Sequence, residues 1–532
     1  GVIYEIYARS FQDTNGDGLG DLEGVITRLD YLVGLGIDAI WLSPIYRSPM
    51  RDFGYDVQDH VAIDPLFGDL ATFDRLVREA HARSLRVILD YIPNHCSDQH
   101  LWFRESRSNR TNPRRDWFIW RDPAPDGGPP NNWRSEFGGP AWTFDAATRQ
   151  YYYHAFLPSQ PDFNWRHPHV RAAMVNVLRF WLDHHVDGFR VDAIHHLFEA
   201  ETLADNPPNP DWRAGEPPAE ALLRDHTVDQ AEVHDAVAEM RRLTDTYAGD
   251  RALIGEAYLP VDRLMAYYGS ALDGFHLPFN FHLMTIPWQP LAVARLVEDY
   301  EAKLPAGGWP NWVLGNHDRS RLASRVGPGQ VKVAAMLLLT LRGTPTLYQG
   351  DELGLEDVPI PPERVRDPWE LNVPGLGLGR DPVRTPMVWS PAPNAGFSGS
   401  DPWLPLSPGW RTINAARQAA DPRSTLSLYR QLLALRRDHP ALTHGSYRTV
   451  GATDQILAYE RQTDDERLQI VLNMSGDVVR WTVPASTLMA ASGDRVGSRL
   501  DGDLLLQPGE GLLLEILDGR PPRPAIGDLP SP

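Results

Sequence analysis

The sequence has a single cysteine, Cys96, among its 532 residues, so no disulfide can form within the chain. This composition fits a reducing compartment. The longest apolar run, Val333–Leu341, is far shorter than the ~20 residues that a membrane-spanning helix needs. No signal peptide is visible, although the chain starts at Gly1 inside a predicted strand, and the natural N-terminus can lie further upstream. We therefore expect a cytoplasmic protein with no membrane anchor.

Basic residues are also scarce. Lys and Arg number 51 against 70 Asp and Glu, which gives a formal net charge of −19. This argues against non-specific binding to nucleic acid or to anionic lipid, while a small uncharged substrate is not excluded. The length exceeds what one compact core supports, so two or three domains are expected. The sequence leaves the oligomeric state open.

Short apolar runs alternate with amphipathic stretches over most of the chain. Phe73, Leu76, Val77 and Ala80, for example, share one face of a helix. Repeated strand and helix predict an α/β protein with a (β/α)8 barrel, known as a TIM barrel. The expected barrel strands are Val2–Tyr7, Ala39–Leu42, Arg86–Ile92, Gly188–Asp192, Leu253–Ala257, Gly274–Phe281, Trp312–Leu314 and Thr346–Gln349, of which Gly274–Phe281 has the weakest pattern.

Two features divide the chain further. Residues 96–165, after the third strand, lack helical periodicity and are rich in Trp, Asn, Pro and Gly, which indicates an inserted subdomain. Beyond residue 440, short alternating runs indicate a separate antiparallel β-sandwich. We thus predict the barrel over 1–95 and 166–440, the inserted subdomain over 96–165, and the C-terminal β domain over 441–532. The expected C-terminal strands are Gln455–Tyr459, Leu468–Leu472, Val479–Val483 and Gly511–Ile516.

Acidic, basic and imidazole side chains follow several predicted barrel strands. An aspartate at any one of these places is equally well explained as a helix cap. The whole set is not, because the active site of such barrels lies at the carboxyl ends of the strands, and crowded carboxylates cost stability and are usually kept for chemistry. The residues concerned are Asp90 and His95, Arg190 and Asp192, Glu256, and His317 and Asp318.

Paired carboxylates with no evident metal cluster favour glycosyl transfer. A retaining glycosidase needs two carboxyl groups about 5–5.5 Å apart, a nucleophile and a proton donor. We predict Asp192 as the nucleophile, with Arg190 lowering its pKa, and Glu256 as the general acid/base, with its pKa raised by burial and negative neighbours. Asp318 is expected to accept hydrogen bonds from sugar hydroxyls.

Five motifs in chain order resemble those of the α-amylase family of glycoside hydrolases, family 13. This resemblance implies a barrel with an inserted domain after the third strand and a C-terminal β domain. It also implies nucleophile, acid/base and transition-state-stabilising roles for Asp192, Glu256 and Asp318. The motifs are Asp90–His95, Gly188–Asp192, Gly255–Glu256, Asn316–Asp318 and Gly343–Glu352.

Gln160–Asn164 is similar to a motif of the oligo-1,6-glucosidase and α-glucosidase group, whose members act from the non-reducing end. The resemblance implies that Asp52, Tyr55 and Arg380 hold the terminal glucose. It further implies a stacking platform at Phe144 and a neighbouring subsite at Glu370. The ring hydroxyls and the distorted transition state would be bound by His95, Arg190, His317 and Asp318.

The residue after the nucleophile is Ala193, where relatives that prefer α-1,6 bonds commonly have valine. We therefore expect an exo-acting α-glucosidase that acts on maltose and short α-1,4-linked gluco-oligosaccharides. A transglucosidase, an isomerase similar to trehalose synthase and an oligo-1,6-glucosidase remain alternatives. An endo-amylase is less favoured, because Glu356–Pro408 can wall off a pocket. A non-catalytic transporter-associated relative would lack a carboxylate and carry a membrane anchor.

A glycine-rich loop near the N-terminus places oxygen side chains at alternate positions, like the start of an EF-hand. Its twelfth position is Gly24, so the bidentate glutamate of an EF-hand is absent. An acidic turn with Asp21 as a helix cap is the alternative. We favour a structural Ca²⁺ and expect no organic cofactor. The predicted ligands are Asp13, Asn15, Asp17, the carbonyl of Leu19, and Asp21.

Overall fold

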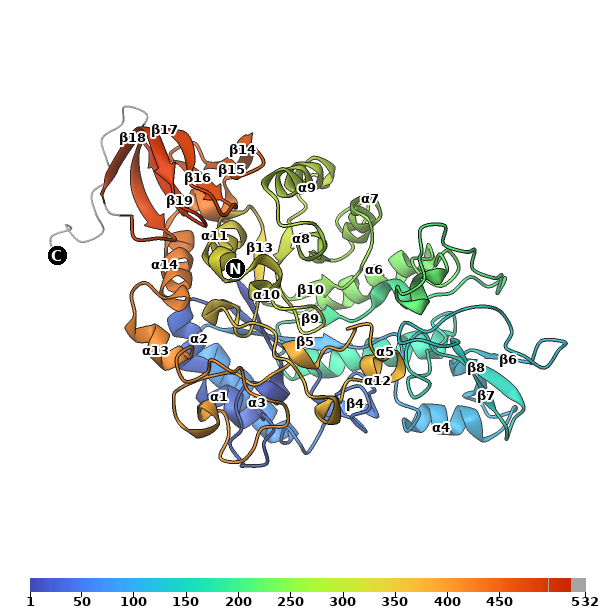
Figure 1. Cartoon of the computed structure of the whole chain (residues 1–532). Coiled ribbons are helices and arrows are strands. Elements are labelled where there is room, and N and C mark those ends of the chain that lie inside the picture. The colour runs from blue at the N-terminus through green and yellow to red at the C-terminus, as the bar shows by residue number, and fades with distance from the viewer. Residues whose placement is uncertain (496, 518–532) are drawn as a thin grey trace.

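The computed structural model describes residues 1–495 and 497–517. Its centre is a closed barrel of parallel strands in the order β1-β13-β12-β11-β10-β9-β5-β2 (Figure 1). Every predicted barrel strand is present, including the weakest one. The strands are β1 (Ile3–Ile6), β2 (Ala39–Leu42), β5 (Arg86–Tyr91), β9 (Gly188–Val191), β10 (Ala252–Gly255), β11 (Leu277–Asn280), β12 (Asn311–Val313) and β13 (Thr344–Tyr348).

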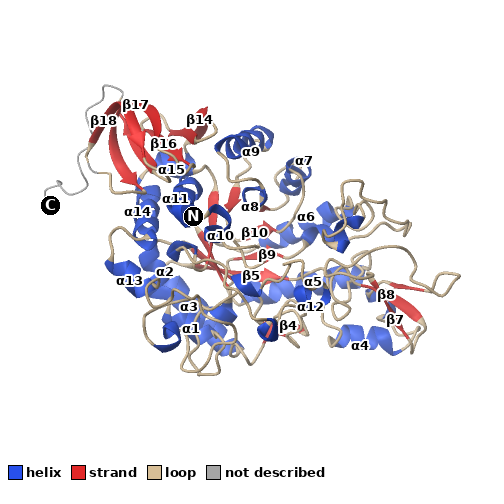
Figure 2. Ribbon diagram, viewed as in Figure 1, coloured by secondary structure: helices blue, strands red, loops and turns tan. Residues whose placement is uncertain are grey.

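Helices surround the barrel, as the blue ribbons around the red strands show in Figure 2. In α5, the buried residues Val170, Met174, Val177 and Trp181 form the stripe that packs against the strands. The helices are α1 (Leu22–Thr27), α2 (Leu29–Leu35), α3 (Leu70–Ala82), α4 (Leu101–Ser108), α5 (Pro168–Asp183), α6 (Glu232–Thr244), α7 (Val261–Met265), α8 (His282–Thr285), α9 (Pro290–Lys303), α10 (Leu322–Val326), α11 (Val331–Thr340), α12 (Pro368–Asn372), α13 (Ala415–Ala420), α14 (Thr425–Asp438) and α15 (Pro440–His444).

The segment between β5 and α5 carries α4 and a small antiparallel sheet in the order β6-β8-β7. Trp133, Trp142 and Tyr153 form the centre of its own apolar cluster. Its end returns to the barrel, where the Phe163 N–H donates to the Asn94 carbonyl at 2.9 Å. These strands are β6 (Trp120–Arg121), β7 (Trp142–Asp145) and β8 (Gln150–Tyr153), and the hairpin β3 (Tyr46–Arg47) and β4 (Asp59–Ile63) lies before α3.

The C-terminal strands form one antiparallel sheet in the order β14-β15-β16-β19-β17-β18. The predicted antiparallel β domain is confirmed, with its strands paired into one continuous sheet. Bulges in β17 between Val483 and Ser486, and between Leu488 and Ala490, let a single sheet bend. The strands are β14 (Ser446–Ala452), β15 (Ile456–Gln462), β16 (Arg467–Asn473), β17 (Val479–Ala491), β18 (Arg499–Leu506) and β19 (Gly511–Ile516), of which β14 and β18 were not predicted. Residue 496 and residues 518–532 of the predicted domain lie outside the described residues.

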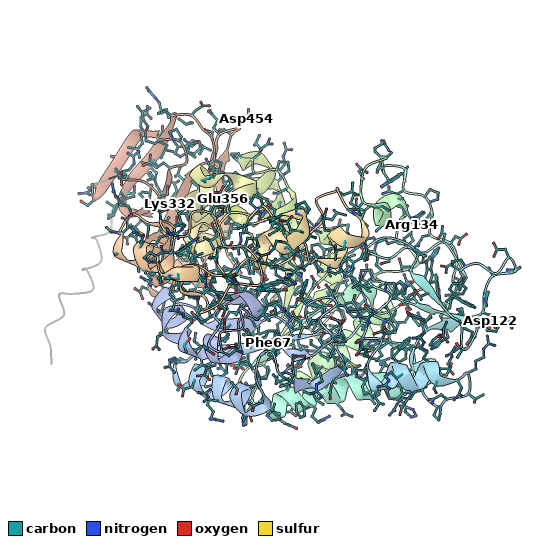
Figure 3. The ribbon with its side chains drawn as sticks, turned by 60° about the horizontal axis from the view of Figure 1, so that its bottom comes forward. Phe67, Asp122, Arg134, Lys332, Glu356 and Asp454 are labelled. Atoms are coloured by element: carbon teal, nitrogen blue, oxygen red, sulfur yellow. The ribbon has the colours of Figure 1, made fainter. Side chains whose placement is uncertain are left out.

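Helix α11 joins the barrel to this sheet, and all but one of its residues are buried. The contact with β19 is close, because a Cβ on Gly511 would lie 2.7 Å from the Met336 sulfur. In Figure 3, Asp122 of the inserted segment lies at the right edge of the molecule, well apart from Asp454 of the C-terminal sheet at the top. Within the described residues, no helix has both the length and the apolar character needed to cross a bilayer.

Candidate active site

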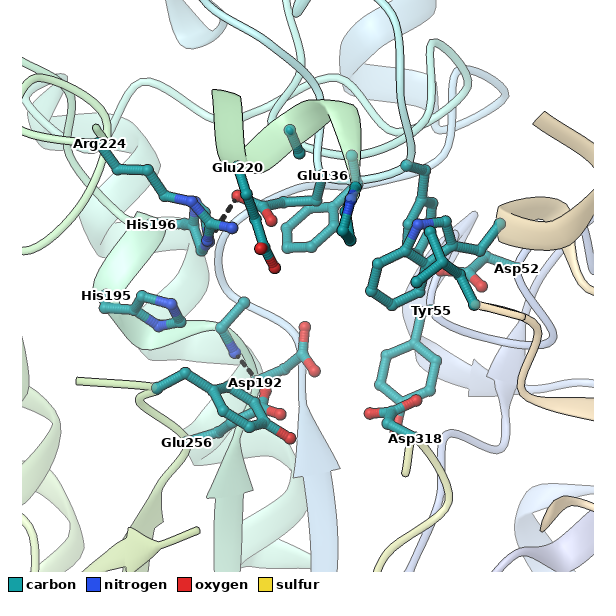
Figure 4. A pocket seen from close by; sticks show the side chains of 18 of the residues that line it. Asp52, Tyr55, Glu136, Asp192, His195, His196, Glu220, Arg224, Glu256 and Asp318 are labelled. Carbon is teal, nitrogen blue, oxygen red and sulfur yellow. Dashed lines mark hydrogen bonds and ion pairs between the residues drawn. The ribbon is translucent and has the colours of Figure 1, made fainter. Parts of the chain in front are cut away.

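A cavity of about 570 Å³ opens at the carboxyl ends of the barrel strands, where most of the predicted site residues come together. Figure 4 shows Asp192 and Glu256 on one side of this cavity and Asp318 and Tyr55 on the other. The inserted segment and the long connection between β9 and α6 also contribute to its walls. The predicted residues that line it are Asp52, Tyr55, His95, Asp192, Glu256, Asp318 and Arg380.

Arg190, in β9, lies beneath the cavity and contacts three carboxylates. Its Nη1 is 2.6 Å from Asp90 and 2.7 Å from Asp192, and its Nη2 is 2.7 Å from Glu256. Alternation along the strand puts Arg190 and Asp192 on the same face, and the parallel pairing of β5, β9 and β10 brings in the other two. A single buried guanidinium therefore fixes the positions of the predicted nucleophile and the predicted acid.

Burial sets the charge state of this cluster. It raises the pKa of Asp192 to about 7; the attraction of Arg190 opposes the shift, whereas Asp90 and Asp318 add to it. Arg190 lowers the pKa of Asp192, as predicted, but burial outweighs this attraction and the net shift is upward. Burial likewise raises the pKa of Glu256 to about 7, with Asp192 and Asp318 adding to it, in the predicted direction. The group thus titrates as one unit near neutrality.

Glu256 follows β10 directly and receives a further hydrogen bond from the backbone. The N–H of Ala193 donates to its Oε2 at 2.9 Å. Ala193 has a left-handed backbone with φ of 43°, which turns this N–H toward the acid. The next residues along the chain, His195 and His196, are buried and also line the cavity.

Asp318 is held from several sides after β12. Its Oδ1 accepts from Arg384 at 2.8 Å and from Arg380 at 3.4 Å, and its Oδ2 is 3.2 Å from the Nε2 of His317. Burial acts to raise its pKa, but His317, Arg380 and Arg384 overcome that effect, and the pKa lies well below its usual range. Asp318 is thus a fixed anion. His317 and Arg190, predicted to bind sugar hydroxyls, lie beneath the cavity lining and act on it through Asp318 and the other carboxylates.

The end of the cavity beside Asp318 is closed by an ion-pair network. Arg380 donates to Asp52 at 2.7 Å and to Asp367 at 2.8 Å. Gln160 donates to the other oxygen of Asp52 at 3.1 Å and lies 3.3 Å from His95. All five side chains are at least nine-tenths buried. Asp367 carried no signal in the sequence, because it lies in an irregular, proline-rich segment.

Two predicted substrate contacts lie elsewhere. Phe144 is on β7, is 45% exposed and packs on Tyr151 with ring centroids 5.1 Å apart, away from the cavity. Its prediction as a stacking platform was wrong because strand alternation turns it outward; Phe137 and Phe156 provide the aromatic faces instead. Glu370 accepts the N–H groups of Gly375 and Gly379 at 2.9 and 3.2 Å. It therefore shapes the loop before Arg380 rather than a subsite wall.

The outer half of the cavity carries charged residues that the sequence did not single out. We call it the acceptor half, lined by Glu136, Glu220, Arg224 and Arg319. The ion pair of Arg224 and Glu136, 2.9 Å long, joins the β9–α6 connection to the inserted segment (Figure 4). These residues lie in irregular loops, where periodicity gives no information on which side chains meet.

The predicted calcium loop holds itself together by its own hydrogen bonds. Asp13 accepts the N–H groups of Gly16 and Gly18, and Asp17 accepts that of Leu19. Asp21 caps α1 by accepting the N–H of Gly24, so one of its carboxylate oxygens already has a hydrogen-bond partner. In the described part of the chain, no three His, Cys, Asp or Glu side chains gather as a metal site would need. The calcium site therefore stays a prediction.

Comparisons with known proteins show which family and fold the chain is similar to. The family model described as alpha amylase, catalytic domain, matches residues 5–445. A probable alpha-glucosidase of Rhizobium meliloti (strain 1021) is 40% identical over 541 residues, covering 99% of this chain and 95% of the relative. An oligo-1,6-glucosidase of Halalkalibacterium halodurans is 37% identical, covering 92% of each. The crystal structure of the alpha-glucosyl transfer enzyme XgtA matches with a TM-score of 0.91 at 38% identity, covering 97% of this chain and 98% of that one.

Proposed function

Because this chain belongs to the α-amylase family of glycoside hydrolases, we propose that it is a retaining, exo-acting α-glucosidase. It releases α-glucose from the non-reducing end of maltose and short α-1,4-linked gluco-oligosaccharides. The observation that carries this proposal is a cavity at the carboxyl ends of the barrel strands with Arg190 between two carboxylates, Asp192 and Glu256, at its base.

In the first step, Glu256 gives its proton to the glycosidic oxygen as a carboxylate oxygen of Asp192 attacks the anomeric carbon. The bond to the leaving sugar breaks, and a β-linked glucosyl ester forms on Asp192. The proton on Glu256 is available near neutral pH because burial has raised its pKa. The low pKa of Asp318 keeps a negative charge beside the ring as positive charge develops on it.

In the second step, Glu256 has lost its proton and takes one from a water molecule. The oxygen of that water attacks the anomeric carbon from the face that the leaving sugar left, and the ester bond to Asp192 breaks. Two inversions give α-glucose, with Glu256 again protonated. Ala193 and Arg190 keep the carboxylate of Glu256 in one place during both steps.

The closed end of the cavity supports the exo action. Arg380, Asp52 and Asp367 fill the space behind the terminal sugar with buried, mutually paired charges. A chain that continued past this sugar would have to displace those groups, which would leave charges buried without partners. The terminal glucose therefore occupies the innermost position of the cavity, with its hydroxyls facing this network.

Transglucosylation is a second candidate, because the same ester can react with a sugar hydroxyl instead of water. The likeness to XgtA, an alpha-glucosyl transfer enzyme, favours it. The preference for α-1,4 bonds rests on Ala193, which lines the cavity. One small side chain there changes the discrimination between α-1,4 and α-1,6 bonds by about 1–3 kcal/mol. The bond preference and the acceptor are therefore determined by measuring the products.

A product time course tests the proposal. Maltose, isomaltose, sucrose and trehalose are each incubated with the protein, and the products are followed by proton NMR. We expect α-glucose to appear first and maltose to be cleaved fastest. Early β-glucose would overturn the retaining mechanism, and faster cleavage of isomaltose would overturn the α-1,4 preference. New oligosaccharides or rearranged disaccharides in place of free glucose would identify a transferase or an isomerase.

A further inference from the structure

Glu5, in β1, is fully buried beneath the cavity, and neither step above uses it. One of its oxygens shares a hydrogen bond with the Nδ1 of His317, while its Oε2 has no partner among the described residues. The Nε2 of His317 lies 2.7 Å from the Tyr55 hydroxyl and 3.2 Å from the Asp318 carboxylate. His317 thus connects Glu5 to two residues that line the cavity.

The position of the protons in this chain follows from counting donors. The single proton of Tyr55 is within reach of Asp90, whose Oδ2 is 2.9 Å away. When Tyr55 donates to Asp90, its oxygen can only accept from His317. On the other side, a lone pair on Nε2 would face the carboxylate of Asp318, which is repulsive. Both neighbours therefore require hydrogen on the Nε2 of His317.

Only two arrangements of the Glu5–His317 pair satisfy both ends. In one, a neutral Glu5 donates to Nδ1 of a neutral imidazole. In the other, the proton has moved to Nδ1 and an imidazolium faces an ionised Glu5. Both contain two protons and have no net charge, whereas the one-proton alternatives leave Nε2 bare or Glu5 charged with no donor facing it.

We propose that Glu5 is a positioning residue of the active site: its pair with His317 keeps two protons during turnover and so holds an N–H at Nε2 between Tyr55 and Asp318. The expected effects of this residue on enzyme activity rest on the proposed function. Asp318 is then held at Oδ1 by Arg384 and at Oδ2 by His317, which fixes its plane against the sugar ring.

The surroundings of Glu5 support a retained proton. Burial raises the pKa of Glu5 well above its usual range; Arg190 in β9 opposes this, and Asp318, Asp90 and Asp351 add to it. An ionised carboxylate would leave Oε2 buried with no donor, which is costly, whereas a carboxylic acid tolerates that position better.

Nitrogen NMR of the wild-type protein labelled with ¹⁵N-histidine tests the proton count directly. The ¹⁵N shift separates a protonated ring nitrogen from a bare one, and a His317→Asn sample assigns the signals. We expect a protonated Nε2 on His317 from pH 5 to pH 8. A bare Nε2 anywhere in this range would overturn the proposal, and this reading does not depend on any activity.

Two variants test the positioning role, with the wild-type turnover of maltose as reference. Glu5→Gln keeps a donor toward Nδ1, so kcat should stay within about threefold of wild type and both limbs of the pH profile should stay in place. Glu5→Leu removes the donor and frees the ring, so kcat should fall about 10- to 100-fold with a smaller change in KM. Loss of activity in folded Glu5→Gln equal to that in Glu5→Leu, or a moved pH limb in Glu5→Gln, would refute the proposal.

Glu352 provides a matched control. It is another fully buried carboxylate, hydrogen-bonded to Tyr4 at 2.9 Å and Tyr31 at 2.7 Å, and neither Glu352 nor these tyrosines line the cavity. Glu352→Gln should lower the melting temperature without changing kcat or the His317 signals. Should Glu5→Leu not fold, the NMR measurement and Glu5→Gln still decide. If wild-type protein cleaves none of the sugars, the proposed function fails while the NMR result stands on its own.

Discussion

The backbone N–H of Ala193 donates a hydrogen bond to the Oε2 of Glu256 at 2.9 Å, from a residue whose φ is 43°. The residue next to the nucleophile thus touches the acid with its backbone and the cavity with its side chain. A substitution at this position acts on two things at once, the space for the leaving sugar and the placement of the proton donor. Different substitutions at Ala193 should therefore change bond preference and reaction rate to different extents.

Ala193→Val should lower kcat/KM for maltose more than for isomaltose. A left-handed backbone costs a residue with a Cβ about 1–2 kcal/mol, and β-branching makes it worse. The two added methyl groups narrow the cavity beside Glu256, so we expect the maltose-to-isomaltose ratio to fall about 10-fold or more. Ala193→Gly relieves the strain and keeps the N–H, and it serves as the control with little change in that ratio. An unchanged ratio in Ala193→Val would show that this residue does not set bond preference.

Asp192→Asn should abolish turnover and stabilise the fold. The variant loses the nucleophile, so kcat should drop by about 10⁴-fold or more. Burial raises the folded-state pKa of Asp192 to about 7, so the folded state binds more protons than the unfolded state between about pH 4 and 7. Wild-type stability is therefore lost as the pH rises through this window, and removing the charge should raise the melting temperature by a few degrees at pH 8.

The control for Asp192→Asn is the same comparison at pH 4, where the wild-type side chain is largely protonated in the folded state. The gain in melting temperature should shrink there. A variant that is less stable than wild type at pH 8 would contradict the picture of a crowded, charged cluster.

The pH dependence of kcat/KM should be bell-shaped with its maximum near pH 7. Asp192 must be ionised and Glu256 protonated, and burial raises both pKa values to about 7. Their coupling separates the two apparent pKa values, one below and one above neutrality, because the first charge discourages the second. Activity should thus fall on the acid side as Asp192 takes up a proton and on the alkaline side as Glu256 loses one.

Glu256→Ala isolates the alkaline limb. With an aryl α-glucoside, whose leaving group needs no proton, the first step should survive and its rate should no longer fall at high pH. Added azide should then attack the ester on Asp192 and give α-glucosyl azide. Formation of the β-azide, or an alkaline limb equal to that of wild type, would show that Glu256 is not the acid.

Arg380→Ala should weaken binding of the terminal glucose. It leaves Asp52 and Asp367 buried without their cation, which lowers the free energy of unfolding by about 3–5 kcal/mol. Asp52 then no longer has a fixed position toward the sugar, so kcat/KM for maltose in the folded variant should fall roughly 10²- to 10³-fold. The double variant Arg380→Ala with Asp52→Ala should be no worse than Arg380→Ala alone, because the two side chains act as one unit. Additive losses in kcat/KM would indicate that they contact the sugar independently.

The barrel and the positions of Asp192, Glu256 and Asp318 follow from the sequence, because strand periodicity fixes which residues reach one mouth. Prediction failed in the inserted segment, where Phe144 was placed in the site, while Phe137 and Phe156 occupy it. The charge state also could not be predicted from spacing. Arg190 lies two residues from Asp192 and lowers its pKa, but burial in the closed barrel outweighs this attraction.

Calcium should stabilise the protein if the loop of Asp13, Asn15, Asp17 and Asp21 binds it. A ligand at 100 times its Kd adds about 2.7 kcal/mol to the free energy of unfolding, so protein treated with chelator should gain several degrees in melting temperature on adding Ca²⁺, and less with Mg²⁺. Asp17→Asn should reduce this gain because Asp17 is exposed and loses only its charge toward the cation. Asp126→Asn, in another exposed acidic turn that accepts the Gly128 N–H at 2.8 Å, is the matched control and should leave the gain intact. Equal melting temperatures with chelator and with Ca²⁺ would mean that the hydrogen bonds of Asp13, Asp17 and Asp21 alone hold the loop.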